Sequence, residues 1–388
     1  MYNRSLTLTL STLESCFLWG PRQVGKSHFL REKYPGARSY DLLSASVFRR
    51  FKINPGLLRE ECEARALSGG TQVQPIIIDE VQKVPELLDE VHWLIENKNL
   101  RFILCGSSAR KLRHGQANLL GGRAVRYEMF PLTTREIPDF SLEKALNSGL
   151  LPKLYGSSHA NRLKQAYVDD YLKEEVVAES LVRNLDYFHR FVEVIGVMNG
   201  EIVKYEKIAS DVGASGKTIK EYFQILVDTL LGFYLPAFTT RRTKRRETLA
   251  PKFFLFDVGI AGYLAKWGRL ESGSLAFGRA FELFLMQEVR AHRSYSEQFY
   301  AIHYWRLSDE YEVDLVLNNG EVIIEFKSVT LVNERHLRGI RALKKIHLAK
   351  YYIVVSRDPA PRQTADGVNI WPWQYFLDQL WSNAILRH

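Results

Sequence analysis

Short apolar runs separated by polar connections mark the first third of the chain. Residues 15–19 form one such run, residues 76–78 are three consecutive isoleucines, and residues 101–108 form a third run that ends in small polar residues. Runs of this length and composition are typical of strands that are buried on both faces of a sheet. The pattern predicts an α/β domain over residues 1–137.

The spacing of apolar residues changes to a helical period after this domain. Between residues 138 and 197, side chains such as Tyr167, Tyr171, Val176 and Val177 recur at helix-like spacing with charged residues between them. Aromatic residues at this spacing are far more often core residues than ligand contacts. The pattern therefore predicts a helical region.

A helix-turn-helix pattern follows. Residues 206–212 predict a helix that ends at Gly213, and Ser215 is a suitable N-cap for a second helix. Apolar runs at 230–235 and 252–256 would add a β-hairpin, which completes a winged helix within a middle region of residues 138–268. On the second helix, Lys217, Thr218 and Lys220 are candidates for contact with DNA. A winged helix that binds protein, or that only packs, is the alternative.

Alternation of polar and apolar residues appears near the C-terminal end. Residues 311–317 alternate as a half-buried strand does, residues 318–320 read Asn-Asn-Gly, which signals a hairpin turn, and residues 321–327 form the returning strand. Asp314, Glu325 and Lys327 then fall at the ends of paired strands. Glu325 and Lys327 share one face, because side chains on a strand repeat every two residues.

Charge indicates a polyanionic partner. The 388 residues carry a net charge of +9. Five cations lie within six residues between the two runs of the predicted hairpin: Arg241, Arg242, Lys244, Arg245 and Arg246. Nucleic acid, and DNA first, fits such an excess, although runs of this density are also common in solvated loops.

Cysteine usage and hydropathy narrow the class of protein. Three scattered cysteines without a Cys-x-x-Cys pair argue against a disulfide framework and a thiolate zinc site, and they fit a reducing cytoplasm. No apolar stretch approaches about 18 residues, and the N-terminus lacks a signal-peptide core. We expect a cytoplasmic protein that does not associate with membranes.

The stretch from Gly20 to Ser27 fits the phosphate-binding loop G-x-x-x-x-G-K-[ST], and it lies between a predicted strand and a helix. Its glycines let backbone N–H groups curl around an anion, Lys26 would neutralise the β- and γ-phosphates, and Ser27 would bind Mg²⁺. The predicted nucleotide-binding residues are Gly20, Pro21, Arg22, Gln23, Val24, Gly25, Lys26, Ser27 and Asp79.

Polar residues follow two of the predicted strands. Asp79 is placed to hold Mg²⁺, and Glu80 to act as general base for the attacking water. Ser107 or Ser108 would sense the γ-phosphate, since ligands lie at the carboxyl ends of parallel strands. Arg123 would act as an arginine finger on a neighbouring subunit of a homo-oligomer, or as an internal sensor; a surface arginine in a structural ion pair is the alternative.

Four segments carry a resemblance to a known family. They contain the phosphate loop at Gly20, the Ile-Ile-Ile-Asp-Glu-Val-Gln-Lys-Val-Pro stretch that begins at Ile76, the Cys-Gly-Ser-Ser segment at Cys105, and Leu-Gly-Gly-Arg ending at Arg123. In this order they resemble a family of prokaryotic AAA-type ATPases with a C-terminal domain of obscure function. The resemblance implies ATP and Mg²⁺ as ligands, and it implies that the helical region is a lid.

The C-terminal pattern resembles a second group. Asp314 on one strand with Glu325-x-Lys327 on the next is similar to the PD-(D/E)XK nuclease superfamily, in which the carboxylates bind Mg²⁺ and the lysine activates water. Glu282, on a preceding helix, would be a further metal ligand. The chain departs from the pattern because Val313, not proline, precedes Asp314.

Two hypotheses result for an α/β multidomain protein with a P-loop NTPase sheet (1–137), a helical lid and winged helix (138–268), and a restriction-endonuclease-like α/β domain (269–388). In the first, an ATPase acts on DNA and carries a Mg²⁺-dependent nuclease, with Lys327 as a catalytic residue and Glu282, Asp314 and Glu325 as metal ligands. In the second, the chain is a nucleotide-gated interaction or regulatory module whose nuclease fold is inactive.

Overall fold

The computed structural model describes residues 2–9, 14–67, 74–108, 120–172, 184–239, 249–308 and 311–386. Within these ranges the chain divides into two compact units. The first unit holds residues 2–137 and 228–231, and the second holds residues 138–172, 184–227 and 232–386, as far as they are described. Each unit contains its own sheet or sheets.

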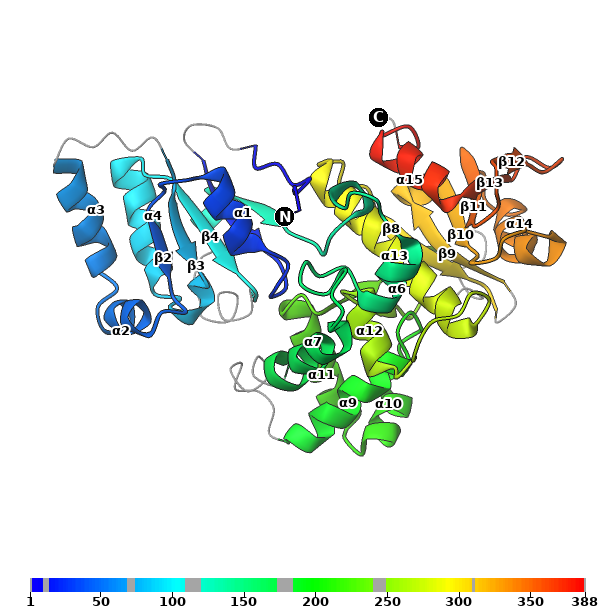
Figure 1. Cartoon of the computed structure of the whole chain (residues 1–388), viewed down its shortest axis with the longest axis horizontal. Helices are drawn as coiled ribbons and strands as arrows, with labels where there is room; N and C mark the ends of the chain where they lie inside the picture. The colour runs from blue at the N-terminus through cyan, green and yellow to red at the C-terminus, as the bar shows by residue number, and fades with distance from the viewer. Residues whose placement is uncertain are drawn as a thin grey trace. The chain divides into compact units, whose positions relative to one another are not determined.

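A parallel sheet of five strands forms the centre of the first unit (Figure 1). Its order is β2-β3-β4-β1-β5, so that β4 lies between the strand that precedes the glycine-rich loop and the strand that ends at Asp79. The three predicted runs supply β1, β3 and β4. The bounds are β1 Ser15–Trp19, β2 Ser39–Asp41, β3 Ile76–Asp79, β4 Phe102–Gly106 and β5 Ala124–Glu128.

Apolar side chains on both faces explain why these strands read as continuous hydrophobic runs. Phe17, Ile78 and Leu104 share a core with Leu94 of α4, while Leu18, which points to the opposite face, is also fully buried. Figure 1 draws β2, β3 and β4 between α4 and α1. The helical elements are α1 Lys26–Lys33, α2 Ala45–Ile53, α3 Leu57–Leu67, α4 Leu87–Lys98 and the short 3₁₀ turns η1 Val81–Lys83, η2 Leu120–Gly122 and η3 Thr134–Glu136.

The second unit begins with helices, which confirms the predicted helical region over its described part. Tyr167 and Tyr171 lie on a π-helical turn and are buried, with ring centroids 4.8 Å apart. Val176 and Val177 lie outside the described residues. The elements of this region are α6 Leu142–Ser148, α7 Ala160–Ala166, η4 Tyr167–Leu172 and α9 Leu185–Val197.

Two further helices and a hairpin follow the predicted order. Helix α10 (Tyr205–Val212) ends at Gly213, whose φ of 80° is the left-handed conformation that favours glycine. Ser215 Oγ accepts a hydrogen bond of 3.1 Å from the Thr218 amide at the start of α11 (Gly216–Asp228). Strands β6 (Gly232–Leu235) and β7 (Lys252–Leu255) pair antiparallel, and Ile202 forms a bridge to Lys252 beside them.

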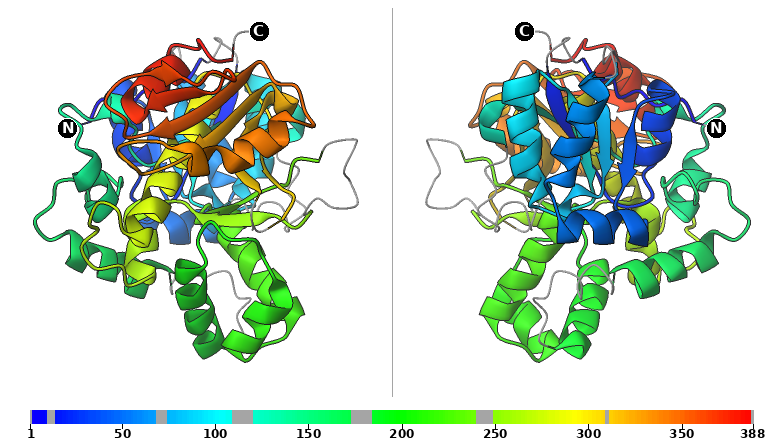
Figure 2. Two further views of the ribbon diagram at one scale, coloured as in Figure 1. Left: turned by 90° about the vertical axis from the view of Figure 1, so that its right-hand side faces the viewer. Right: turned by 90° about the vertical axis from the view of Figure 1, so that its left-hand side faces the viewer.

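A mixed sheet of six strands forms the C-terminal part of the second unit, in the order β12-β13-β11-β10-β9-β8 (Figure 2). The predicted pair corresponds to β9 and β10, which are antiparallel, and the connecting residues Asn319 and Gly320 have φ of 55° and 98°. The strands are β8 Ile302–Arg306, β9 Glu312–Leu317, β10 Val322–Phe326, β11 Tyr351–Ser356, β12 Arg362–Gln363 and β13 Asn369–Pro372. The remaining elements are η5 Asn318–Gly320, η6 Glu334–Leu337 and the helices α12 Val258–Leu264, α13 Leu275–Tyr295, α14 Arg338–Lys344 and α15 Trp373–Trp381.

The segment that follows β6 runs along the edge of this sheet. The Tyr304 amide of β8 donates a 3.0 Å hydrogen bond to the Pro236 carbonyl, and the Phe238 amide donates a 2.6 Å bond to the Tyr304 carbonyl. Phe238 also packs against the core of the six-stranded sheet, which includes Trp305. The hairpin is therefore joined to the sheet by backbone pairing and by apolar contact.

Candidate functional site

The glycine-rich loop connects β1 to α1 at the carboxyl edge of the parallel sheet. Gly25, the N-cap of α1, has a φ of 102° that strains a residue with a side chain. A Cβ atom at Gly20 would lie 2.5 Å from the Met129 carbonyl oxygen, so only glycine fits there. Both predicted glycines thus shape a loop whose amides precede a helix N-terminus, an arrangement suited to binding an anion.

Lys26 is buried inside this loop, with 6% of its surface exposed. Its ammonium donates hydrogen bonds of 2.6 Å to the Gly20 carbonyl and 3.0 Å to the Pro21 carbonyl. Burial lowers the pKa of Lys26, while the nearby Glu80 and Asp79 carboxylates act in the opposite direction. A cation whose donors point to neutral carbonyl oxygens can exchange them for phosphate oxygens.

Ser27 and Asp79 meet beside the loop. The Ser27 hydroxyl donates to Asp79 Oδ2 over 2.5 Å, and Asp79 is 8% exposed. Burial raises the pKa of Asp79, and the Ser27 hydrogen bond opposes this effect. A hydroxyl and a carboxylate at one point supply the hard oxygen ligands that Mg²⁺ prefers, so these two residues fit the ion.

Glu80 lies in a network with Gln82 and Ser107. Its backbone adopts φ 58° and ψ 44°, a left-handed conformation that costs about 1–3 kcal/mol in a residue other than glycine. The Ser107 hydroxyl donates to Glu80 Oε2 over 3.1 Å, and the Gln82 amide donates to the same oxygen. The sequence left Ser107 and Ser108 as alternatives, and the structure places the Ser107 hydroxyl on Glu80. Gln82, within the Asp-Glu-x-Gln spacing, was not predicted as a site residue.

Arg123 is not brought to this loop. It precedes Ala124, which pairs with Ser15 at the amino ends of the strands, whereas the loop follows Trp19 at the carboxyl end of β1. Its guanidinium forms an ion pair with Glu96 of α4, and both side chains are more than a third exposed. This position gives no geometric support to an internal sensor, and an action on a neighbouring subunit stays a prediction.

The predicted DNA-contact residues divide between described and undescribed parts. Lys217 and Lys220 are exposed on α11, and the Lys220 ammonium lies 5.2 Å from the centroid of the Tyr205 ring. The five cations Arg241, Arg242, Lys244, Arg245 and Arg246 lie outside the described residues.

The second unit brings together the carboxylates predicted near its C-terminal end. Asp314 of β9 accepts a 2.7 Å hydrogen bond from the Phe326 amide, and Glu325 of β10 forms an ion pair with Lys327. Burial, followed by the Asp314 charge, raises the pKa of Glu325. Burial likewise raises the pKa of Glu282, which α13 supplies. Glu325 Oε2 is buried and accepts no hydrogen bond from the described residues.

Lys252 of β7 lies among these carboxylates and was not predicted. It is 4% exposed, forms an ion pair with Glu312, and places its ammonium 3.6 Å from Glu282 Oε1. Arg306 contacts the other carboxylate oxygen of Glu312, at 3.1 Å. The only local signal was a single lysine at the start of the apolar run Lys-Phe-Phe-Leu-Phe.

The predicted metal-ligand set of Glu282, Asp314 and Glu325 stays a prediction, and the described geometry does not by itself form a metal site. Among the residues that the structure describes, no three His, Cys, Asp or Glu side chains are grouped so that they could hold a metal ion. The Lys252 and Lys327 ammonium groups form ion pairs with Glu282 and Glu325, and they place positive charge among these carboxylates.

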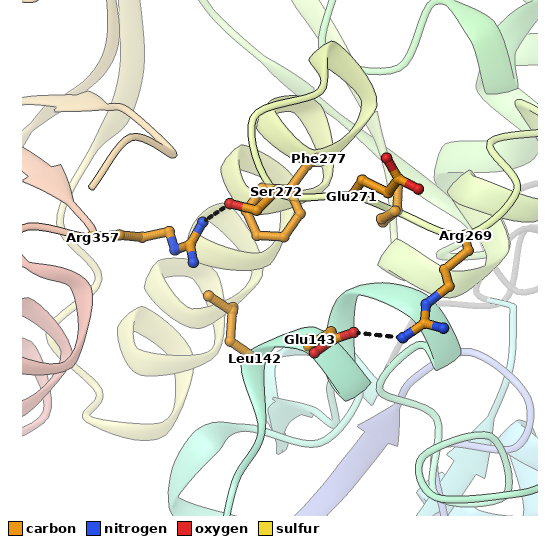
Figure 3. A pocket seen from close by; sticks show the side chains of 8 residues that line it. Leu142, Glu143, Arg269, Glu271, Ser272, Phe277 and Arg357 are labelled. Atoms are coloured by element: carbon orange, nitrogen blue, oxygen red, sulfur yellow. Dashed lines mark hydrogen bonds and ion pairs between the residues drawn. The ribbon is translucent and has the colours of Figure 1, made fainter. Parts of the chain in front are cut away.

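A separate polar pocket of about 430 Å³ lies in the second unit (Figure 3). The Arg357 guanidinium lies over the Phe277 ring, 5.0 Å from the ring centroid, and donates a hydrogen bond to the Ser272 hydroxyl. Arg269 pairs with Glu143 at 3.2 Å. Both arginines are therefore already partnered, and the pocket contains none of the predicted site residues.

Comparison with known proteins divides the chain into three matched segments. Residues 14–138 match an AAA domain, residues 139–271 match a domain of unknown function (DUF8612), and residues 277–376 match another domain of unknown function (DUF4143). The first match confirms the predicted AAA-type domain, and the others agree with a C-terminal part of obscure function. No helix in the described part of the chain is long and apolar enough to cross a bilayer.

Three individual proteins resemble parts of the chain at low sequence identity. An uncharacterized protein of Haemophilus influenzae is 27% identical over 207 residues, which cover 47% of this chain and 50% of that protein. The chain thus spans about half the length of this curated relative. The Aeropyrum pernix ORC1 protein, solved in complex with DNA, is 11% identical with a TM-score of 0.25, covering 65% of this chain and 86% of its own. A Pyrococcus horikoshii signal transduction ATPase with numerous domains is 15% identical with a TM-score of 0.22, covering 74% and 48%.

Proposed function

We propose that the chain binds ATP with Mg²⁺ at the loop from Gly20 to Ser27, hydrolyses it, and acts on DNA. The observation that carries the proposal is the convergence at one sheet edge of the buried Lys26 ammonium, the Ser27–Asp79 pair and the Glu80 carboxylate held by Ser107. Phosphoryl transfer to water requires a cation at the phosphates, ligands for Mg²⁺ and a general base, and these groups can supply each of them.

Each residue has a separate task in this proposal. Lys26 holds the β- and γ-phosphates, since its ammonium can exchange two carbonyl partners for phosphate oxygens. Ser27 and Asp79 hold Mg²⁺, which when bound draws charge from the phosphate oxygens. Glu80 accepts a proton from the attacking water, and Ser107 fixes one of its carboxylate oxygens.

Phosphate release by the purified chain tests the proposal. We expect turnover that requires Mg²⁺ and that rises when single- or double-stranded DNA is added. A chain that neither binds nor hydrolyses ATP would contradict the first clause. If neither single- nor double-stranded DNA changed the rate of turnover, the proposed action on DNA would be contradicted.

DNA contact is proposed for the winged helix. The support is the order α10, Gly213, α11 and the β6–β7 hairpin, with Lys217 and Lys220 exposed on the second helix. The finer division into an ATPase core (1–137), a helical lid with the winged helix (138–268) and a nuclease-like domain (269–388) belongs to the same proposal.

Replacing Lys217 and Lys220 together by alanine should weaken DNA binding at low salt. Because each phosphate contact releases counterions, the slope of log affinity against log salt should fall by about 1 per lysine. Fluorescence anisotropy over a salt series measures this slope. Lys207→Ala, on the exposed face of α10, is the matched control and should leave the slope unchanged. An equal loss in the control would point to a general charge effect.

A second candidate function is favoured by Lys252. In this reading the C-terminal domain is a nuclease fold without activity, and ATP gates its binding to a partner. A buried ammonium within 3.6 Å of Glu282 and paired with Glu312 makes metal binding unnecessary for charge balance. This candidate would be excluded if the chain cleaved DNA in the presence of Mn²⁺ and the Glu325→Gln variant did not.

Lys252→Met should convert the carboxylate cluster into a metal-responsive one. The change leaves Glu282 and Glu312 without their cation, which costs roughly 3–5 kcal/mol, so the variant should melt lower in EDTA. Mn²⁺ should restore much of the loss in the variant and leave the unaltered chain nearly unaffected. Thermal melting of the nucleotide-free protein with and without Mn²⁺ measures both effects. Lys266→Met, an exposed lysine paired with Glu193, is the control.

A further inference from the structure

Gln82 lies inside the candidate ATP site, but neither the phosphate loop nor the metal pair accounts for it. It is 6% exposed and sits on η1, the 3₁₀ turn that directly follows Glu80. Its Nε2 donates to Glu80 Oε2, and it also lies 3.2 Å from the Ser107 hydroxyl oxygen. The left-handed backbone of Glu80 turns the chain so that a side chain two residues later returns to the carboxylate.

The orientation of the Gln82 amide is fixed by its partner. An ionised carboxylate only accepts hydrogen bonds, so the NH₂ end of the amide has to face Glu80. The other end, Oε1, is then directed away, and it is buried without a hydrogen bond from any described residue. Gly106 borders it: a Cβ atom there would lie 2.5 Å from this oxygen.

These features are unfavourable for packing alone. A buried carbonyl without a donor destabilises the fold, and an isosteric methionine would avoid that cost. Glu80 adds a second unfavourable feature, its left-handed backbone. Local features of this kind that gather at one place are expected at functional sites.

We propose that Gln82 positions Glu80 for proton transfer during ATP hydrolysis. With Ser107, it fixes Oε2 of the carboxylate, so that Oε1 faces the attacking water. The water oxygen then bonds to the γ-phosphorus, and the bond to the β–γ bridging oxygen breaks. Its electron pair leaves on ADP, and the proton of the water passes to Glu80. This inference rests on the proposed ATP hydrolysis and assigns a positioning residue to it.

Gln82→Met tests this inference, because methionine keeps the volume of the side chain and removes the amide. We expect kcat to fall about 10- to 100-fold, a part of the effect of a general base, while KM and the affinity for a fluorescent ATP analogue change less than about twofold. The melting temperature should change little, because removal of the unpaired Oε1 offsets the lost donor to Glu80, whose Oε2 still accepts from Ser107. Gln74→Met, a glutamine whose amide donates to the Pro35 carbonyl, is the control and should behave as the unaltered chain.

A double-mutant cycle with Glu80→Gln separates positioning from a general structural role. If Gln82 acts through Glu80, the double variant should turn over ATP as slowly as Glu80→Gln alone. The inference would be overturned if the losses of kcat in the two single variants multiplied in the double variant. It would also be overturned if kcat in Gln82→Met were unchanged, or if ATP affinity and melting temperature fell in parallel with kcat. If the unaltered chain did not turn over ATP, the proposed ATP hydrolysis itself would be contradicted. The same assay thus distinguishes failure of the proposed function from failure of this inference.

Discussion

Lys26→Ala should weaken ATP binding about 100- to 1,000-fold, because removing one member of a buried charge pair costs about 3–4 kcal/mol. Lys26 is the first residue of α1 and is almost fully buried under the loop that it would share with the phosphates. Titration with a fluorescent ATP analogue measures the affinity, and phosphate release should fall below detection at the same nucleotide concentration.

Alanine at this position also removes two hydrogen bonds to loop carbonyls, so the fold needs its own control. Lys26→Met retains the aliphatic stem and should lose the same affinity with less loss of stability. Lys33→Ala removes an exposed lysine from the last turn of the same helix and should bind ATP normally. Turnover that persists in both Lys26 variants would show that phosphate binds elsewhere.

Glu80→Gln should separate binding from chemistry. The amide keeps the shape of the side chain, and its oxygen can still accept hydrogen bonds from Ser107 and Gln82. It cannot accept a proton from water, so kcat should fall about 100- to 10,000-fold while ATP affinity stays within a few-fold. Single-turnover hydrolysis and equilibrium titration measure the two quantities.

Glu86→Gln is the matched control for this change. Glu86 is a half-exposed carboxylate that pairs with Lys52, close in sequence to Glu80 but outside the network. We expect its turnover to equal that of the unaltered chain. Should Glu80→Gln hydrolyse ATP at a rate within a few-fold of normal, another group would have to activate the water.

The elements that the sequence predicted best are those whose signal is local. Strands β1, β3 and β4 are buried on both faces, which leaves continuous apolar runs, and the loop between β1 and α1 has fixed spacing. Strand β5 has one buried residue among its five, Tyr127, and β2 has only three residues, so neither formed a recognisable apolar run. Arg123 directly precedes β5, so the edge of the sheet at which Arg123 lies depends on the direction of this strand. The position of Arg123 could therefore not be predicted.

The features that the sequence did not predict depend on contacts between distant residues. Lys252 forms ion pairs with Glu282 and Glu312, which follow it by 30 and 60 residues in the sequence. No local sequence pattern predicts such a pairing. Gln82 contacts Glu80 only because Glu80 adopts a backbone conformation that a glutamate rarely takes. The contact between Ser107 and Glu80 likewise depends on the direction of one hydroxyl.

The pairing of the segment 236–238 with β8 has a consequence for how the C-terminal part can be isolated. An edge strand with free amide and carbonyl groups is a template for intermolecular strand addition, and here Pro236 and Phe238 occupy those groups of Tyr304. A fragment that starts at residue 269 would expose this edge and would lose Lys252 from its carboxylates. Segment 236–238 therefore covers the edge of the sheet at Tyr304, and the compact unit that contains the sheet begins before the segment that a sequence match delimits.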